Sequence, residues 1–185
     1  STSRFDRWFD EKYGQGKSHR QWLKAHIMCG VKTNVVTSVE VTPSSVHDSP
    51  VLGSLVDSTA QRFQMAEVVA DKAYLSDRNL AILTQAGAVP YIPFKVNTVE
   101  GRGSELWQQM YHFFMLNRET FLAHYHQRSN VESTFSMVKR KFGDSIRSKT
   151  EVAQVNEVLL KILAHNICCL IQAMYELGIN PTFWA

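Results

Sequence analysis

The segment from Tyr125 to Lys141 limits the possible fold of this chain more than any other stretch. Built as an α-helix with about 100° between successive residues, it brings four polar side chains into an arc of roughly 60°. These four are Tyr125, Arg128, Glu132 and Lys139. The adjoining flank is apolar and would seat the helix on a core. It consists of Val131, Phe135, Val138 and Phe142. The segment therefore predicts a helix with one buried flank and one polar, exposed face.

The four polar groups suit chemistry on a phosphodiester. A carboxylate can hold a divalent metal ion through hard oxygen ligands. The guanidinium, the ammonium and the phenol can bind phosphate oxygens. The ordinary alternative is an i,i+4 ion pair between Arg128 and Glu132 on a solvated helix face. Residue chemistry alone leaves both interpretations open.

A second acidic residue stands where a short strand is predicted to end. The apolar run 65–70 has strand length and is followed directly by Asp71. Carboxyl ends of strands are where α/β sheets bind ligands. The alternative is that Asp71 caps the next helix, but Ser76 already stands at that position, ahead of an apolar helical pattern. Asp71 is therefore a candidate functional carboxylate.

Composition fits one globular domain. Apolar content of 44% and charged content of 20% over 185 residues are ordinary for such a domain. A net charge of +3 does not by itself prove a nucleic-acid partner. The basic residues are nevertheless concentrated between 128 and 149, where the acids are only Glu132 and Asp144. They are Arg128, Lys139, Arg140, Lys141, Arg147 and Lys149.

Cysteine usage and hydropathy indicate a cytoplasmic protein with no membrane segment. The cysteines are three, an odd number, and two of them are adjacent at 168–169, which favours reduced thiols. The sequence shows no signal peptide. The longest apolar run, 162–171, is interrupted by His165 and Asn166 and is too short to span a bilayer. These two polar residues are expected to be satisfied core groups.

The remaining pattern predicts alternating strands and helices, and hence an α/β fold. Residues 22–29 and 35–42 alternate as in a β-hairpin, with its turn at 30–34. A helix is expected from Pro50 to about Arg62, capped by Ser49 or Asp48. Asp48 could instead be a catalytic carboxylate. Residues 88–94 predict a weak edge strand because they contain two prolines.

Two more helices follow from the pattern. Ser104 is expected to cap one that carries an aromatic stripe, interpreted as core and alternatively as a nucleotide-stacking platform. Thr150 is expected to cap the final helix, which Gly178 ends. Its apolar positions are predicted to face the core: Val152, Val155, Leu159, Ile162, Leu163, Ile167, Leu170 and Met174. Residues 1–20 mix basic and aromatic side chains and predict a loop or short helix packed on the domain, alternatively a DNA contact.

The spacing of the four polar residues adds a family resemblance. Two, three and six residues separate them in turn. This spacing resembles the Y-R-E-K signature of DDE transposases from bacterial insertion sequences. Residues 68–74, VVADKAY, resemble the strand that carries the second acid of that family.

The resemblance implies an RNase H-like mixed sheet flanked by helices, with a helical insertion at about 95–124. It matches Asp71 with the second catalytic acid and Glu132 with the third, both ligands of Mg²⁺ or Mn²⁺. It matches Tyr125, Arg128 and Lys139 with contacts to DNA, and the neighbouring Arg140 and Lys141 extend this basic surface. The implied partner is double-stranded DNA, at transposon ends and target, bound by a homodimer.

The first acid of the family has no convincing match. Asp6 and Asp10 lie in no apolar run. We therefore expect residues 1–185 to be a single, N-terminally truncated catalytic domain that lacks its first strand, with that strand and its Asp ahead of Ser1. Strand cleavage and transfer should be weak or absent. Two alternatives remain: an RNase H-like nuclease that cuts without joining, and a non-catalytic DNA-binding remnant.

Overall fold

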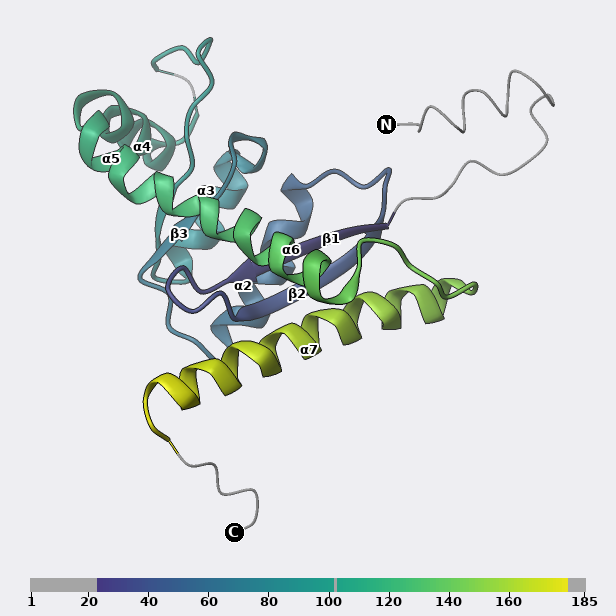
Figure 1. Cartoon of the computed structure of the whole chain (residues 1–185). Helices are drawn as coiled ribbons and strands as arrows, with labels where there is room; N and C mark the ends of the chain where they lie inside the picture. The colour runs from purple at the N-terminus through teal and green to yellow at the C-terminus, as the bar shows by residue number, and fades with distance from the viewer. Residues whose placement is uncertain (1–22, 102, 180–185) are drawn as a thin grey trace, which may run out of the picture.

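The computed structural model describes residues 23–101 and 103–179, and the predicted segment 1–20 lies outside them. Within this part, two small sheets lie among helices, and the long helix α7 runs along one side of the molecule (Figure 1). The strands are β1 (Leu23–Cys29), β2 (Val36–Pro43), β3 (Glu67–Val69) and β4 (Val89–Tyr91). The α-helices are α2 (Leu52–Ala60), α3 (Asp77–Gln85), α4 (Glu105–Leu116), α5 (Arg118–Tyr125), α6 (Ser129–Phe142) and α7 (Glu151–Glu176). Three 3₁₀ helices connect them: η1 (Ser49–Val51), η2 (Lys72–Tyr74) and η3 (His126–Arg128).

The predicted hairpin is confirmed. β1 and β2 pair antiparallel, with Leu23 opposite Pro43, and the register shifts next to Cys29. Successive side chains of a strand point to opposite faces of the sheet. Met28 meets α2 through the Thr59 hydroxyl at 3.7 Å, and Cys29 meets α6 through the Thr134 hydroxyl at 3.6 Å. The hairpin is therefore sandwiched between α2 and α6.

The second sheet consists of β3 and β4, which run parallel. Pro90 lies opposite Val68, as expected for an edge strand that tolerates a residue without an N–H. In the described part of the chain no strand pairing joins this sheet to the hairpin. The predicted α/β class is confirmed, and the described strands form two separate two-stranded sheets.

The main hydrophobic core lies around the second sheet. The aromatic stripe of α4 belongs to it, as predicted: Phe114 is buried there and Trp107 packs against it. Phe121 of α5 is fully buried. Its ring lies 4.9 Å from that of Phe114 and 5.4 Å from that of Tyr91. Edge-to-face and tilted ring pairs of this kind add to the stability from burial alone.

The predicted single helix from Tyr125 to Lys141 is interrupted. α5 ends at Tyr125, the 3₁₀ turn η3 follows, and α6 begins at Ser129. The Ser129 hydroxyl donates to the carbonyl of His126, a local bond that competes with regular helical bonding. Backbone angles at Tyr125 (φ −60°, ψ −35°) and Arg128 (φ −55°, ψ −29°) stay right-handed. The chain therefore keeps its direction through the interruption.

Helix α7 departs most from its prediction. Thr150 caps it, accepting a hydrogen bond from the Ala153 N–H, and Gly178 follows its end with φ +66°, both as expected. Among its predicted core residues, however, only Ile162 is fully buried. The helix lies beside the hairpin instead of across a core, so that one side touches protein and the other faces outward. By length and hydropathy alone α7 could cross a membrane, which the sequence interpretation of 162–171 did not expect.

The two polar residues that interrupt the apolar run of α7, His165 and Asn166, are hydrogen-bonded to the hairpin region, as predicted. The Asn166 side chain accepts from the Val36 N–H and donates to the Val36 carbonyl, each at 2.8 Å. The fully buried His165 ring lies 2.9 Å from the Asn34 carbonyl through Nε2. Its Nδ1 has no partner in the described residues. These contacts tie α7 to the start of β2.

Candidate functional site

The Asp71 side chain does not cap a helix. It precedes the 3₁₀ turn η2, and its side chain makes no cap hydrogen bond. Ser76 caps α3 instead, accepting a hydrogen bond from the Asn79 N–H at 3.2 Å. Asp71 lies two residues beyond the end of β3, and its carboxylate is 46% exposed. The sequence argument that separated Asp71 from helix capping is therefore confirmed.

Arg128 brings the two predicted carboxylates together. One terminal nitrogen of its guanidinium lies 2.8 Å from Glu132 Oε1. The other lies 3.7 Å from Asp71 Oδ2. Residues 61 positions apart in the chain thus share a single cation.

Tyr125 completes this cluster. The Arg128 guanidinium carbon lies 5.9 Å from the centre of the Tyr125 ring, within cation–π range. Burial lowers the pKa of Arg128, but Tyr125, Glu132 and Asp71 together raise it above its usual value. Tyr125 also packs on the aromatic core through Phe121, with 6.5 Å between ring centres. The tyrosine therefore connects the cluster to the aromatic core.

The basic residues Lys139, Arg140 and Lys141 occupy the last turn of α6 and are exposed. Cations are favoured there by the helix dipole. Among the described residues they form no salt bridge. Glu132 and Lys139 lie seven residues apart on the same helix, which is close to two turns. A basic surface thus continues along α6 from the carboxylates.

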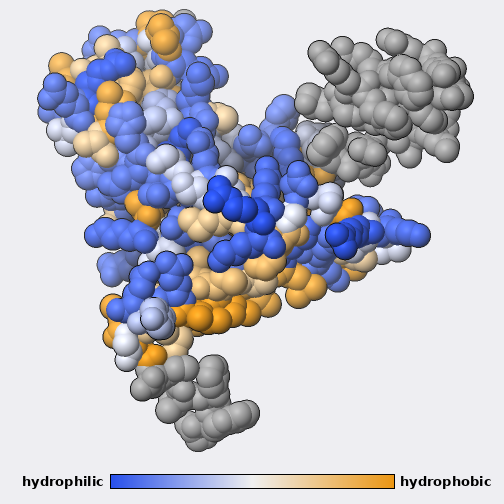
Figure 2. All heavy atoms as spheres, viewed as in Figure 1, coloured by the Kyte–Doolittle hydropathy of each residue, from blue (hydrophilic) through white to orange (hydrophobic). Residues whose placement is uncertain are grey.

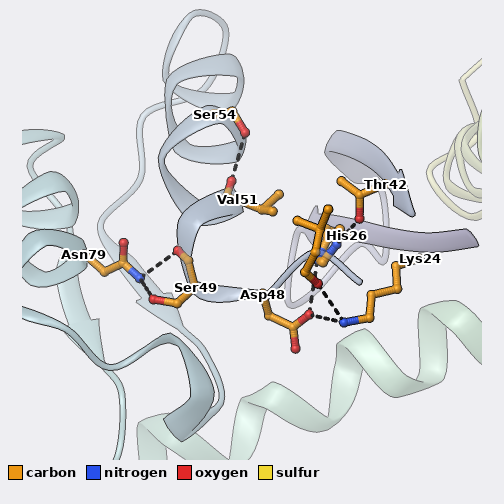
Figure 3. Close-up of polar contacts among 9 residues, drawn as sticks. Lys24, His26, Thr42, Asp48, Ser49, Val51, Ser54 and Asn79 are labelled. Carbon is orange, nitrogen blue, oxygen red and sulfur yellow. Dashed lines mark hydrogen bonds and ion pairs between the residues drawn. The ribbon is translucent and has the colours of Figure 1, made fainter. Parts of the chain in front are cut away.

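Asp48 does not act as the predicted cap, since η1 has no side-chain cap bond. Its carboxylate instead lies 3.2 Å from Lys24 Nζ and 3.8 Å from His26 Nδ1 (Figure 3). The buried His26 ring lies 2.9 Å from the Thr42 hydroxyl through Nε2. Polar residues at alternate positions of β1 were the available sequence signal for this network. The Asp48 carboxylate binds Lys24 instead of capping the helix because a cation is a stronger partner than a backbone N–H.

Asn79 links the Asp71 segment to the Asp48 segment. Its side-chain nitrogen donates to the Tyr74 carbonyl at 2.7 Å. It also donates to the Ser49 hydroxyl at 3.0 Å (Figure 3). Burial raises the pKa of Tyr74, and the charges of Asp48 and Asp71 raise it further. The Tyr74 hydroxyl therefore lies within the electrostatic field of both carboxylates. Sequence analysis did not find this link, because an Asn within a helix gives no signal of a tertiary bond.

The donor set fits a divalent cation of the Mg²⁺ type. Asp71 and Glu132 offer hard carboxylate oxygens on exposed side chains, and Mg²⁺ is commonly bound by one or two carboxylates with water and substrate phosphates. The described residues contain no cluster of three or more His, Cys, Asp or Glu side chains suited to a metal ion. The two carboxylates would therefore need oxygen ligands from solvent or substrate.

Comparison with known proteins identifies the family. A family model described as Transposase DDE domain matches residues 1–167. No curated protein and no solved structure matches the chain. The family match spans both carboxylates, the Arg128 bridge and the basic end of α6. The chain belongs to the transposase DDE domain family, a class of enzymes that bind and cut DNA.

Proposed function

We propose that this chain is the larger part of a DDE transposase catalytic domain, and that Asp71 and Glu132 are its second and third catalytic carboxylates. The observation that carries this proposal is the shared guanidinium of Arg128, which holds both carboxylates at one place. A family match alone would give the activity class but not the residues. The convergence of β3 and α6 on one cation supports this assignment.

Mg²⁺ or Mn²⁺ bound by these carboxylates would activate a water or a DNA 3′-hydroxyl and stabilise the leaving oxygen. The protein's own groups position the DNA. Arg128 offers a planar donor fork that suits a phosphate. Its charge also offsets two carboxylates that would otherwise repel the DNA backbone. Tyr125, Lys139, Arg140 and Lys141 extend the contact along α6, in keeping with the Y-R-E-K spacing.

We also propose that the complete domain has an RNase H-like sheet, with one more strand between the hairpin and β3. Its support is the absence of pairing between the two sheets of the described chain. That strand would carry the first catalytic Asp. With two of three carboxylates, cation binding is weak, and the chain has little strand-transfer activity. The helical segment 95–124 is then an insertion between β4 and α6.

The decisive experiment measures Mn²⁺-dependent nicking of supercoiled DNA together with DNA binding. Glu132→Gln should abolish residual nicking and spare DNA binding, because it removes an oxygen ligand and keeps the shape. Glu119→Gln, on an exposed position of α5, is the matched control and should nick like wild type. Nicking that persists in Glu132→Gln would contradict the assignment.

Two further measurements separate the alternatives. In calorimetry, Asp71→Ala should reduce Mn²⁺ binding; a DNA-binding remnant would show no Mn²⁺ binding, or binding that ignores this change. A 3′-hydroxyl DNA donor should yield some joined product with a transposase. A nuclease of the same fold would cut this substrate and join none.

A second test concerns the basic surface. Lys139→Ala should weaken DNA binding and lower the slope of log K against log [salt] by about one, the loss of one phosphate contact. Arg62→Ala, just beyond α2 on the opposite side of the hairpin, removes the same charge and should leave the slope unchanged. Equal slopes for wild type and Lys139→Ala would exclude the phosphate contact.

A further inference from the structure

Helix α7 exposes a continuous apolar stripe. Seven aliphatic side chains on its outer side are between 37% and 72% exposed. They are Val152, Leu159, Leu160, Leu163, Ile167, Leu170 and Ile171. Figure 2 shows hydrophobic residues gathered along the edge of the molecule where α7 lies. Residue-by-residue exposures of this size amount to roughly 600 Å² of apolar surface, the upper end of the range for the largest apolar patch on a monomer.

The stripe repeats every eleven residues. Leu159 and Leu160 recur as Leu170 and Ile171. Val152 recurs as Leu163, and Asn156 has its counterpart in Ile167. Eleven residues make three turns of 3.67 residues, so the stripe runs nearly parallel to the helix axis. From residue 152 to 171 it extends about 30 Å. Such a straight apolar seam fits another straight helix of similar length.

The opposite side of α7 already contacts the hairpin region. Asn166 and His165 bond to the hairpin, and Ile162 is buried beside them. A bilayer-spanning orientation would surround the whole helix with lipid and break these bonds. The stripe contains no Asp, Glu, Lys or Arg, which makes it unsuited to a DNA backbone. These observations favour an apolar protein surface as its partner.

We infer that the stripe is a homodimer interface, in which α7 packs against α7 of a second copy. The helix is complementary to itself, because its straight eleven-residue seam can be matched along its whole length by the same seam. The apolar area per copy, roughly 600 Å², approaches the ~800 Å² per partner of a standard interface.

Asn156 gives this interface a polar position. It lies within the seam, among the residues that border a shallow surface pocket: Asn156, Leu159, Leu160 and Leu163. A single Asn at a seam position lowers the stability of a helix pair while fixing its register. Replacing it by an apolar residue of similar size should therefore strengthen association. A stripe that merely happened to be exposed would not respond in this way.

The test is sedimentation equilibrium of the whole chain over micromolar concentrations, without DNA or divalent metal. A reducing agent is present so that Cys168 and Cys169 cannot cross-link copies. Wild type should dimerise. Leu163→Glu should be monomeric over the same range, and Asn156→Leu should lower the dissociation constant roughly tenfold, about 1.4 kcal/mol. Leu116→Glu, at a 79% exposed position of α4, is the matched control and should dimerise like wild type.

Three results would overturn the inference. The first is a monomeric wild type. The second is a dimer that Leu163→Glu does not weaken. The third is an Asn156→Leu variant that binds no more tightly than wild type. A monomer that instead floats with neutral phosphatidylcholine vesicles, and loses this on Leu163→Glu, would assign the stripe to a membrane surface. None of these outcomes depends on the transposase assignment.

Discussion

The two halves of this molecule differ in the interactions that stabilise each of them. The aromatic half comprises β3, β4 and helices α3 to α5, and its hydrophobic core also includes Leu52 and Val56 of α2. The hairpin half comprises β1, β2 and the helices α2, α6 and α7 around them. Much of its buried set is polar: His26, Ser38, Thr42, Thr59, Thr134 and His165. The contrast is between burial of apolar surface, which has no preferred direction, and hydrogen bonds, which do.

The candidate site lies where the two halves meet. Asp71 follows a strand of the aromatic half, and Glu132 stands on the helix that covers the hairpin. Arg128 contacts both. Apolar packing gives Tyr125 and its neighbours a rigid support. Directional bonds then set the position of the hairpin half relative to it. The comparison teaches that the aromatic half supports the site by close packing, and that hydrogen bonds of the hairpin half fix the relative position of its elements.

The largest effect is expected in the aromatic half. Phe121→Ala removes a fully buried ring from contact with four other rings and should lower the free energy of unfolding by about 3–5 kcal/mol. Urea denaturation measures it. Phe63→Ala, at a 48% exposed position, should change stability by no more than about 0.5 kcal/mol. Equal losses in the two variants would remove the distinction between the halves.

An intermediate effect is expected in the hairpin half. Asn166→Ala leaves both the N–H and the carbonyl of the buried Val36 without their side-chain partner, and should lower the free energy of unfolding by about 1–3 kcal/mol. Gln172→Ala on the same helix removes only an exposed bond to Glu176 and should be nearly neutral. Hydrogen exchange should show the loss of protection first in β2. An equal loss of protection in both halves would contradict the inference that Asn166 holds β2 in place.

The smallest effect is a pH dependence confined to the hairpin half. The pKa of Glu157 is lowered to about 2. The largest cause is the hydrogen bond from the Ser148 N–H, and the bonds from Lys161 and the Arg147 N–H contribute less. A folded-state pKa below the ordinary 4.5 gives stability that is present above pH 4.5 and lost as pH falls toward 2. Unfolding measured across this window should depend less on pH in Glu157→Gln than in wild type. Identical pH profiles would show that Glu157 does not hold the loop before α7.

Sequence reasoning predicted the local features well. The hairpin, the caps at Ser76, Ser104 and Thr150, and the aromatic core of α4 all depend on neighbouring residues, and each is confirmed. The convergence of Asp71 and Glu132 was an expectation from family spacing. Hydrophobic periodicity alone cannot predict that the end of a strand lies close to the face of a distant helix.

The errors share a physical cause. Asp48 was assigned to a helix cap because capping is local, whereas its actual partners lie on β1. The outer residues of α7 were assigned to the core because apolar periodicity reports a face without reporting what covers it. The 3₁₀ turn at 126–128 was missed because its residues are compatible with a continuous helix. Tertiary partners decided the first two cases, and the local bond from Ser129 to His126 accompanies the third.

Asn166 has a consequence for how the hairpin can be extended. Its side-chain amide occupies both backbone polar groups of Val36, at the outer edge of β2. An incoming strand from another chain would have to displace this amide before adding there, so Asn166 protects the molecule against edge-to-edge aggregation. The opposite edge, along β1, has no strand partner in the described chain. Growth of the sheet is thereby restricted to one direction, the side on which the proposed additional strand would lie.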